Sequence, residues 1–180
     1  MRATLSFKRS LLCAVILCAG CGGGRDRVPA GYAMLQPVAG GQVQGMVIFG
    51  QRPDGLRVAA TISGLSPGQH GFHIHEATDC SASEAGKSGA DFNPAGAHHG
   101  HFEGGEHHAG DLPNLVTEAS GNANYASDIP GLSIGSGIFN IAGRTIVIHA
   151  RADDYNSQPD GNSGRPIACG VIKTGPPPEK

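Results

Sequence analysis

The chain is 180 residues long, contains 29 glycines, 12 prolines and no tryptophan, and has a formal net charge of −2. Three of its 13 basic residues and none of its 15 acidic residues lie within the first 21 positions, so the remaining chain is near −5. This balance argues against a nucleic-acid partner, for which a basic stripe is expected. A small anionic substrate is compatible with it, because steering depends on the local field.

A secretory leader is expected over residues 1–21. Basic residues within the first nine positions precede the apolar run 11–20, which is shorter than the roughly 20 residues that span a bilayer and is typical of a signal peptide. The segment 17–21, LCAGC, resembles a bacterial lipoprotein signal, in which Cys21 carries the lipid. Because Cys18 stands where leucine is usual, simple secretion is the alternative. Both routes imply export, and we expect a periplasmic protein with a lipid anchor to a membrane.

Composition divides the rest of the chain into three parts. Residues 22–35 are expected to form a tether that is largely polar and glycine-rich, residues 36–173 one domain, and residues 174–180 a proline-rich tail. The domain is long enough to bury a core of its own.

Short alternating runs predict β-strands in this domain. Alternate positions of residues 43–49 and 57–62 are apolar and face one side, while Asp54-Gly55 between the two runs predicts a hairpin. Later β-like runs are centred on residues 71–76, 145–150 and 168–172. Helical periodicity is almost missing, so we expect an all-β fold, an antiparallel β-sandwich or barrel.

Histidine is concentrated in one part of the chain, since eight of the nine histidines lie between His70 and His108. Neutral imidazole is the commonest protein ligand for copper and zinc, so we expect a transition-metal site. His73 and His75 are two apart in a β-run and would share one face at roughly 7 Å spacing. His149 follows an apolar run and could add a third imidazole, and three such ligands suit copper.

A second group of candidate ligands lies in the long loop-like stretch from residue 76 to residue 113. It consists of Asp91, His98, His99, His101, His107, His108 and Asp111. His108 and Asp111 fall within one tight turn, which suits a closed zinc site with nitrogen and oxygen ligands. The alternative is a solvated, histidine-rich segment that binds metal without defined geometry.

The cysteines agree with export. After removal of the leader only Cys80 and Cys169 remain, and two thiols in an oxidising compartment predict one disulfide. Two unrelated buried thiols are the alternative.

Five motifs in series resemble those of the Cu/Zn superoxide dismutase family. They are 71–76 GFHIHE, 92–94 FNP, 108–112 HAGDL, 143–149 GRTIVIH and 168–172 ACGVI. Their order matches that of the family, and the resemblance extends from about residue 42 to residue 172. It implies a Greek-key antiparallel β-barrel with long metal-binding loops, and an enzyme with copper and zinc that converts superoxide into oxygen and hydrogen peroxide.

The resemblance also implies a role for particular residues. The matching positions are His73, His75 and His149 for copper, His99, His108 and Asp111 for zinc, Cys80 and Cys169 for a disulfide that holds the metal loop to the barrel, and Asp153 for a carboxylate that orients one copper histidine and one zinc histidine. Such outer ligands fix the tautomer and pose of a ring. The remaining histidines of the region, His70, His98, His101 and His107, are expected to be surface or loop residues.

The chain departs from the family pattern at two positions. Asp91 stands where the family has the histidine whose imidazolate bridges copper and zinc, and a carboxylate lacks the second nitrogen. With an ordinary pKa of about 3.9 it would be a poorer proton carrier near neutral pH. Pro166 stands where the family has the arginine that attracts superoxide, and Arg165 lies one residue earlier. A small backbone shift would let Arg165 reach the site as the catalytic arginine, whereas an ordinary surface charge is the alternative.

The sequence therefore favours an exported superoxide dismutase, whose activity is reduced by Asp91 and Pro166. One alternative is an exported copper-binding or copper-delivery protein with the same fold and weak or no activity. Another is a structural or zinc-only relative. The assembly is expected to be a homodimer or a monomer.

Overall fold

The computed structural model describes residues 30–38, 40–81 and 89–179. The expected leader and the lipidation site at Cys21 lie outside these described residues. Within them, no helix has the length and apolar character needed to cross a membrane.

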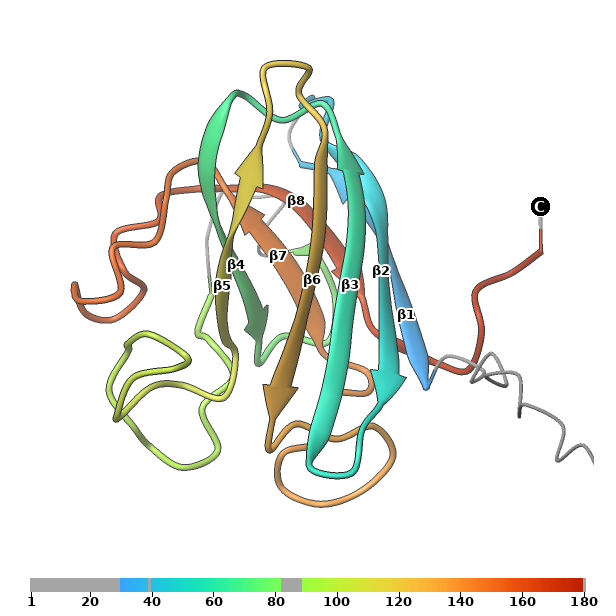
Figure 1. Cartoon of the computed structure of the whole chain (residues 1–180), viewed down its shortest axis with the longest axis vertical. Helices are drawn as coiled ribbons and strands as arrows, with labels where there is room; N and C mark the ends of the chain where they lie inside the picture. Colours follow the sequence, from blue (N-terminus) through green and yellow to red (C-terminus); the bar gives the residue numbers. More distant parts are fainter. Residues whose placement is uncertain (1–29, 39, 82–88, 180) are drawn as a thin grey trace, which may run out of the picture.

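Nine β-strands make up the regular structure of the described part (Figure 1). They are β1 (Gly31–Pro37), β2 (Gln44–Gln51), β3 (Gly55–Ser63), β4 (Gly68–His75), β5 (Asp111–Thr117), β6 (Ala123–Pro130), β7 (Thr145–His149), β8 (Pro166–Val171) and β9 (Lys173–Thr174). This is the all-β fold that the alternating runs predict.

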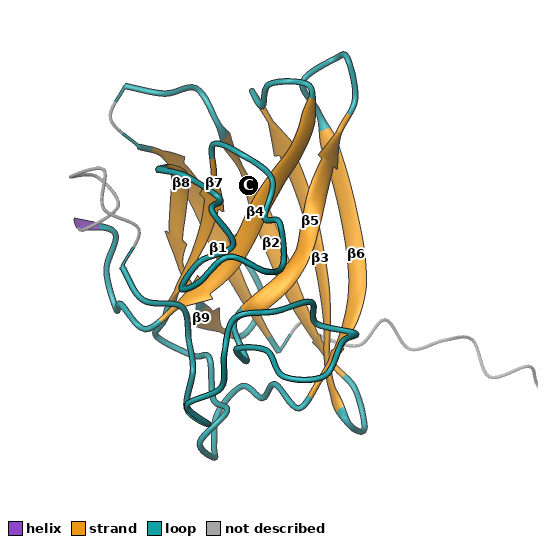
Figure 2. Cartoon of the chain, turned by 90° about the vertical axis from the view of Figure 1, so that its left-hand side faces the viewer, coloured by secondary structure: helices purple, strands orange, loops and turns teal. Residues whose placement is uncertain are grey.

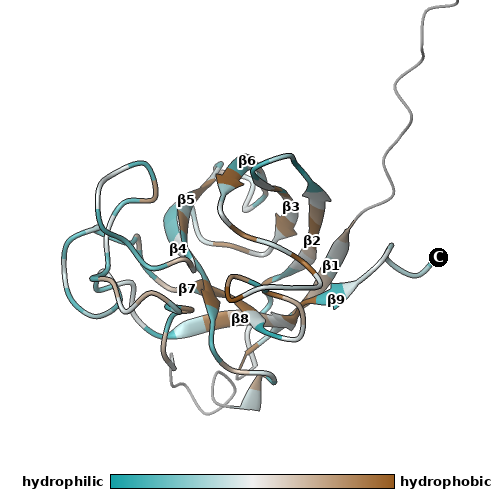
Figure 3. Ribbon diagram, turned by 90° about the horizontal axis from the view of Figure 1, so that it is seen from below, coloured by the Kyte–Doolittle hydropathy of each residue, from teal (hydrophilic) through white to brown (hydrophobic). Residues whose placement is uncertain are grey.

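The strands wrap into one antiparallel sheet that is nearly closed on itself (Figure 3). The order across the sheet is β5-β4-β7-β8-β1-β2-β3-β6, and every ladder between these strands is antiparallel. The chain crosses from β3 at one side to β4 at the other, and returns from β5 to β6 and then to β7. This connectivity is that of the Greek-key β-barrel of the Cu/Zn superoxide dismutases.

The alternation read from the sequence decides which side chains enter the barrel. In the β2–β3 hairpin, Val47 pairs with Ala60 and Phe49 pairs with Val58, and all four side chains are buried. The turn that joins the two strands closes with the Arg52 amide donating to the Gly55 carbonyl over 3.0 Å. Side chains on one face of each strand thereby fill the interior, as a period of two requires.

The main hydrophobic core lies inside the barrel, and a smaller cluster surrounds the disulfide. The largest fully buried side chains of the main core are Leu35, Phe49, Leu56, Ile62, Phe72, Ile74, Phe92, Leu112, Leu115, Ile141, Ile146 and Ile148. Phe72, Ile74, Ile146 and Ile148 come from β4 and β7, the strands that also carry His73, His75 and His149. The metal-binding side of the barrel therefore rests on a packed interior, which holds these strands in place.

The first strand lies inside the segment expected to be a tether. Gly31–Pro37 pairs with β2, and the side chains of Ala33 and Leu35 are completely buried or nearly so. The tether predicted over residues 22–35 is therefore too long, because Ala33 and Leu35 contribute to the core. At the other end Thr174 still pairs with Gly31, so the tail begins one residue later than expected.

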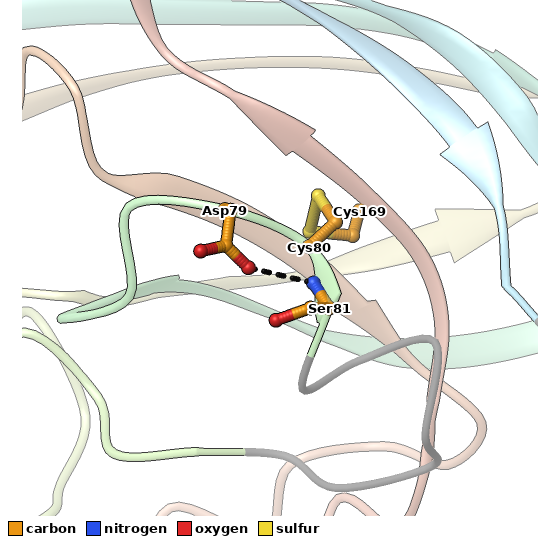
Figure 4. The surroundings of a disulfide bond; sticks show 4 residues. All are labelled: Asp79, Cys80, Ser81 and Cys169. Carbon is orange, nitrogen blue, oxygen red and sulfur yellow. Dashed lines mark hydrogen bonds between the residues drawn. A yellow bond between two sulfur atoms is a disulfide. The ribbon is translucent and has the colours of Figure 1, made fainter.

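Two long loops project from the same side of the barrel, next to β4, β5 and β7 (Figures 1 and 2). One joins β4 to β5 and the other joins β7 to β8. The disulfide between Cys80 and Cys169 ties the first loop to β8, with the two Cα atoms 5.8 Å apart (Figure 4). Val38 and Val147 pack around it. The single disulfide expected from the cysteine count is thus present.

Candidate metal centre

Three buried histidines meet at the base of these loops. His73 and His75 come from β4 and His149 ends β7, and all three are at most 1% exposed. One ligand atom from each lies within 4.8 Å of the others. The ring nitrogens Nε2 of His75 and His149 are 3.3 Å apart, and two donors that are each about 2 Å from a shared ion lie about that far from one another.

Hydrogen bonds to the outer nitrogens turn the other nitrogens toward the shared point. The Nδ1–H of His149 donates to the Gly164 carbonyl over 2.9 Å, which leaves its Nε2 facing the cluster. The Nε2–H of His73 donates to Asp153 over 2.8 Å, and its Nδ1 is buried with no hydrogen-bond partner. Each ring is therefore held in the tautomer that presents a lone pair to a cation.

A second cluster holds two histidines and two aspartates. Asp91, His99, His108 and Asp111 each place one donor atom within 4.8 Å of the others. Nδ1 of His99 lies 3.1 Å from Oδ1 of Asp111, and Nδ1 of His108 lies 3.3 Å from the same oxygen. All four residues are buried, so the loop is not a solvated histidine-rich segment without geometry.

Backbone amides orient the Asp111 carboxylate. Its Oδ2 accepts hydrogen bonds from the amides of His108 over 2.8 Å and Gly100 over 3.1 Å. Its Oδ1 is buried and has no hydrogen-bond partner. One oxygen is thus used to hold the turn, and the other is left for a cation.

The unpartnered atoms test whether metal ions fit the two clusters. Nδ1 of His73, Nδ1 of His99, Oδ1 of Asp91 and Oδ1 of Asp111 are buried without a hydrogen bond. A buried polar atom without a partner costs on the order of 1–3 kcal/mol. The other three such atoms in the described residues, on Thr117, Tyr125 and Ser163, lie outside the clusters, so four of the seven are found at the two sites. Three imidazoles suit copper, and two imidazoles with carboxylate oxygens suit zinc. The residues fit both ions.

Asp91 lies between the two clusters. Its Oδ1 is 3.3 Å from Nε2 of His75 and 3.6 Å from Nδ1 of His73. Its Oδ2 is 3.4 Å from Nδ1 of His108 and 3.7 Å from Nδ1 of His99. The carboxylate therefore occupies the place between the two sets of histidines, as its position in the motif series suggests.

Asp153 joins the two clusters from the outside. Its Oδ2 accepts from Nε2 of His73 over 2.8 Å, and its Oδ1 accepts from Nε2 of His99 over 2.9 Å. Asn114 fixes the backbone of Asp153 through two hydrogen bonds of 2.9 Å. A Cβ on Gly161 would meet Oδ1 of Asp153 at 1.7 Å, so only glycine leaves room for this carboxylate.

In the second cluster, despite burial, the carboxylates raise the pKa of the imidazoles, and the imidazoles lower the pKa of Asp111. Burial favours the neutral ring, yet the carboxylates of Asp111, Asp153 and Asp91 raise the pKa of His99 to about 12. Burial is likewise outweighed at His108, where Asp111 and Asp91 raise the pKa to about 9. These rings hold protons where a metal ion would bind, so metal uptake must displace protons.

The cluster of three histidines contains an imidazole that stays neutral. Burial, together with the positive charge of His73 and His75, lowers the pKa of His149 to about 3. Burial also disfavours the ionised form of Asp91, but the neighbouring rings of His108 and His99 hold its pKa well below the ordinary value. An anionic carboxylate thus stands beside a neutral imidazole donor.

Arg165 does not join the metal cluster. It is exposed, and it borders a surface depression that is lined by residues of the β1–β2 and β3–β4 connections and by Ile167. Pro166 begins β8 opposite His149, so the residue at the family's arginine position is part of the barrel wall. A role for Arg165 in attracting superoxide stays a prediction: its side chain is exposed, and its carbonyl accepts from the amide of Ala150, the residue after His149, over 2.9 Å.

The other histidines of the region divide into two kinds. His98 is exposed, and His101 and His107 are half-buried in the β4–β5 loop, outside both clusters, as expected. His70 was expected at the surface, but its side chain is buried, with Nδ1 2.8 Å from the His149 carbonyl oxygen. A bulge after His70 changes the alternation in β4, and no spacing rule reveals this.

Comparison with known proteins agrees with this geometry. The profile of the copper/zinc superoxide dismutase family matches residues 43–172. A protein called superoxide dismutase [Cu-Zn] from Deinococcus radiodurans is 37% identical over 144 residues, which cover 74% of this chain and 79% of the relative. Superoxide dismutase [Cu-Zn] 2 from Brassica juncea is 37% identical over 149 residues, 79% of this chain and 95% of the relative. The protein of that name from Aquifex aeolicus is 36% identical over 138 residues, 74% of this chain and 81% of the relative.

Proposed function

Since the chain belongs to the copper/zinc superoxide dismutase family, we propose that His73, His75 and His149 hold the copper ion of its reaction. That reaction converts superoxide into oxygen and hydrogen peroxide. One observation carries the assignment of copper to these residues. Three imidazoles from two strands converge on one buried point, and hydrogen bonds fix two of them with a nitrogen facing it.

Zinc is assigned to the second cluster, with His99, His108, Asp111 and Asp91 as ligands. The mixed nitrogen and oxygen donors and the burial of all four residues suit a closed structural zinc site. Its cation would also tie the β4–β5 loop to the start of β5, since Asp111 is the first residue of that strand. The zinc site would therefore also hold in place the loop that lies beside the copper ligands.

The copper ion supplies the one-electron chemistry by alternating between two oxidation states. The chain supplies rigid donors, because His73 and His75 lie in a strand whose other side chains, Phe72 and Ile74, are fully buried. Asp153 accepts the hydrogen bond of the outer nitrogen of His73 and so orients the ring with its inner nitrogen toward the ion. With its pKa held below the ordinary value, Asp91 is ionised at neutral pH and does not supply the protons that peroxide formation consumes. Solvent is their source.

The assignment is tested by loading the mature protein with Cu²⁺ and Zn²⁺ and measuring superoxide decay against an equal concentration of free copper salt. We expect copper-dependent activity well above the salt, and we expect His149→Ala to abolish both this activity and stoichiometric copper uptake. The matched control is His98→Ala, an exposed histidine of the same loop region, which should leave both unchanged. Tight copper uptake without activity above the salt would favour the copper-binding or copper-delivery alternative instead.

We also propose that the protein is exported and carries a lipid on Cys21. The basic and apolar leader and the LCAGC segment support this proposal, and so does the disulfide between Cys80 and Cys169, which suits an oxidising compartment. Labelling of cells with a radioactive fatty acid should mark the wild-type protein but not a Cys21→Ala variant. Label retained by the variant would contradict the lipid anchor on Cys21.

The oligomeric state is a separate question. Sedimentation of the domain without its lipid would decide between a monomer and a homodimer.

A further inference from the structure

The two oxygens of the Asp91 carboxylate face different clusters. Oδ1 lies within 3.6 Å of ring nitrogens of His73 and His75, and Oδ2 lies within 3.7 Å of ring nitrogens of His99 and His108. The side chain is only 2% exposed, so water does not compete for these oxygens. Each oxygen thus faces donors of one cluster.

The backbone holds Asp91 in this place. It forms a β-bridge with His75, and the next amide, that of Phe92, donates to the Ile74 carbonyl over 2.8 Å. Phe92 is fully buried in the core beneath the guanidinium of Arg144, whose Cζ lies 3.9 Å from the ring centroid. This pairing and packing fix the backbone position from which the Asp91 carboxylate projects between the two clusters.

The carboxylate also has unused acceptor capacity. Oδ1 has no hydrogen-bond partner, and the contact of Oδ2 with Nδ1 of His108, at 3.4 Å, is with a nitrogen that is itself a zinc ligand in our assignment. An ionised carboxylate offers about four lone-pair sites, two on each oxygen. Buried charges are paired or coordinate metals, and both clusters provide a place for a cation.

We propose that Asp91 bridges the two metal ions directly, with Oδ1 bound to copper and Oδ2 bound to zinc. The proposal rests on the proposed function, because it uses the metal assignment made there. It gives the copper ion a fourth protein ligand, an oxygen, and makes the link between the two ions a carboxylate instead of an imidazolate. The shorter carboxylate would hold the two ions closer together than an imidazole ring does.

Asp153 offers the competing link, and its geometry differs. It reaches His73 and His99 at Nε2, the outer nitrogens, while the inner Nδ1 atoms face the clusters. Asp153 therefore positions two rings from behind and does not stand between the ions. This difference provides a matched pair of variants.

The test loads the protein with Cu²⁺ at the copper site and Co²⁺, a paramagnetic substitute, at the zinc site. A direct bridge couples the two spins, so the electron paramagnetic resonance signal of Cu²⁺ should lose most of its intensity when Co²⁺ is added. Asp91→Ala should restore the signal, and Asp153→Asn should not. Glu103→Gln, at an exposed carboxylate of the β4–β5 loop outside both clusters, serves as the surface control and should behave as wild type.

A second variant and a second measurement keep the proposal testable if Asp91→Ala does not fold. In Asp91→Asn, which preserves shape but removes the negative charge, the visible absorption of Co²⁺ should change because one zinc-site oxygen ligand is weakened. The bridge is overturned if both metals bind the wild-type protein and the Cu²⁺ signal stays at full intensity. It is equally overturned if the coupling persists undiminished in Asp91→Ala.

The same preparations separate this proposal from the proposed function. Wild-type protein that dismutates superoxide but shows no coupling rejects the bridge and leaves the function intact. Failure to take up stoichiometric Cu²⁺ at all rejects the copper assignment, and the bridge with it.

Discussion

His70 is hydrogen-bonded to the backbone of His149, with 2.8 Å between its Nδ1 and the His149 carbonyl oxygen. The ring of His70 is buried between β4 and the end of β7, and its Nε2 lies 3.0 Å from the Ser66 carbonyl oxygen. A buried side chain thus connects the turn before β4 to the residue that supplies the third imidazole. The ring of His70 contacts the backbone of His149 and belongs to neither cluster. In our assignment it therefore affects copper binding only by positioning His149.

Replacing His70 should therefore weaken both the fold and copper binding. We expect His70→Ala to lower the free energy of unfolding by about 1–3 kcal/mol, because the buried carbonyl oxygen of His149 is left without its donor. Chemical denaturation of the metal-free protein measures this loss, and competition with a chelator measures the accompanying fall in copper affinity. His98→Ala, at an exposed position, should change neither. A loss in His70→Ala no larger than in this control would show that the contact is unimportant.

The metal-free protein should become less stable between about pH 6.5 and about pH 9. In the folded state the pKa of His108 is raised to about 9 and that of His99 to about 12, whereas both are near 6.5 in the unfolded chain. A raised pKa stabilises fully below the unfolded value, and the contribution is lost as the pH rises toward the folded value. Melting temperatures over this interval check the trend.

The zinc-loaded protein should behave differently over the same pH interval. Zinc needs the deprotonated rings, so rising pH removes competing protons and its binding stabilises the fold more strongly. The variant His108→Gln, which cannot be protonated at this position, should show a weaker loss of stability in the metal-free state. A metal-free melting temperature that is constant or rises from pH 6.5 to pH 9 would be incompatible with these raised pKa values.

The carboxylate at position 91 should lower the rate of superoxide decay, because it does not carry protons between pH 5 and pH 9. An ionised Asp91 with a lowered pKa does not transfer protons near neutral pH, whereas an imidazole can. Proton transfer by a positioned group contributes about 10²–10⁴-fold in other enzymes. We therefore expect Asp91→His to be faster than wild type, by about 10-fold or more near neutral pH, where an imidazole exchanges protons readily. Superoxide decay from pH 5 to pH 9 measures the difference, and equal rates throughout would refute a handicap from the carboxylate.

Removing the disulfide should destabilise the whole domain. Cys80 and Cys169 are 89 residues apart in sequence, and closing a loop of that length stabilises by about 4–5 kcal/mol in the chain-entropy model. The double variant Cys80→Ser with Cys169→Ser should therefore unfold at lower denaturant concentration than wild type. Wild-type protein kept in reductant is the natural comparison. If the variant is as stable as wild type, the crosslink does not constrain the unfolded chain.

The link between the disulfide and the metals can be measured in the same variant. Cys80 lies in the segment that leads from His75 at the end of β4 toward Asp91. Without the crosslink the two ends of that segment are still held, by the ion pair of Glu76 with Arg144 and by the backbone pairing of Asp91 and Phe92 with β4. Zinc affinity should fall along with stability, and an unchanged affinity would show that these contacts are sufficient.

The sequence determined the features that depend on neighbours along the chain. A period of two places Val47 and Phe49 inside the barrel and His73 and His75 on a common side, because successive side chains of a strand point to opposite faces. The hairpin at Asp54-Gly55 also depends on neighbours along the chain, because these two residue types favour a tight turn. The count of two cysteines outside the leader predicted the disulfide, and the motif series added the order of the proposed ligands, which spacing alone leaves open.

Only the tertiary structure decided how segments far apart in sequence meet. The burial of His70 against the His149 carbonyl joins residues that are separated by loops, and no sequence pattern pointed to it. The resemblance implied the role of Asp153 and the place of Asp91, and the structure supplied their distances to the two clusters. The exposed position of Arg165 was likewise decided by the tertiary structure. Pro166, which stands at the family's arginine position, is the first residue of β8 and so part of the barrel wall. Such contacts depend on how the loops pack against the core, and residue spacing carries no information about that packing.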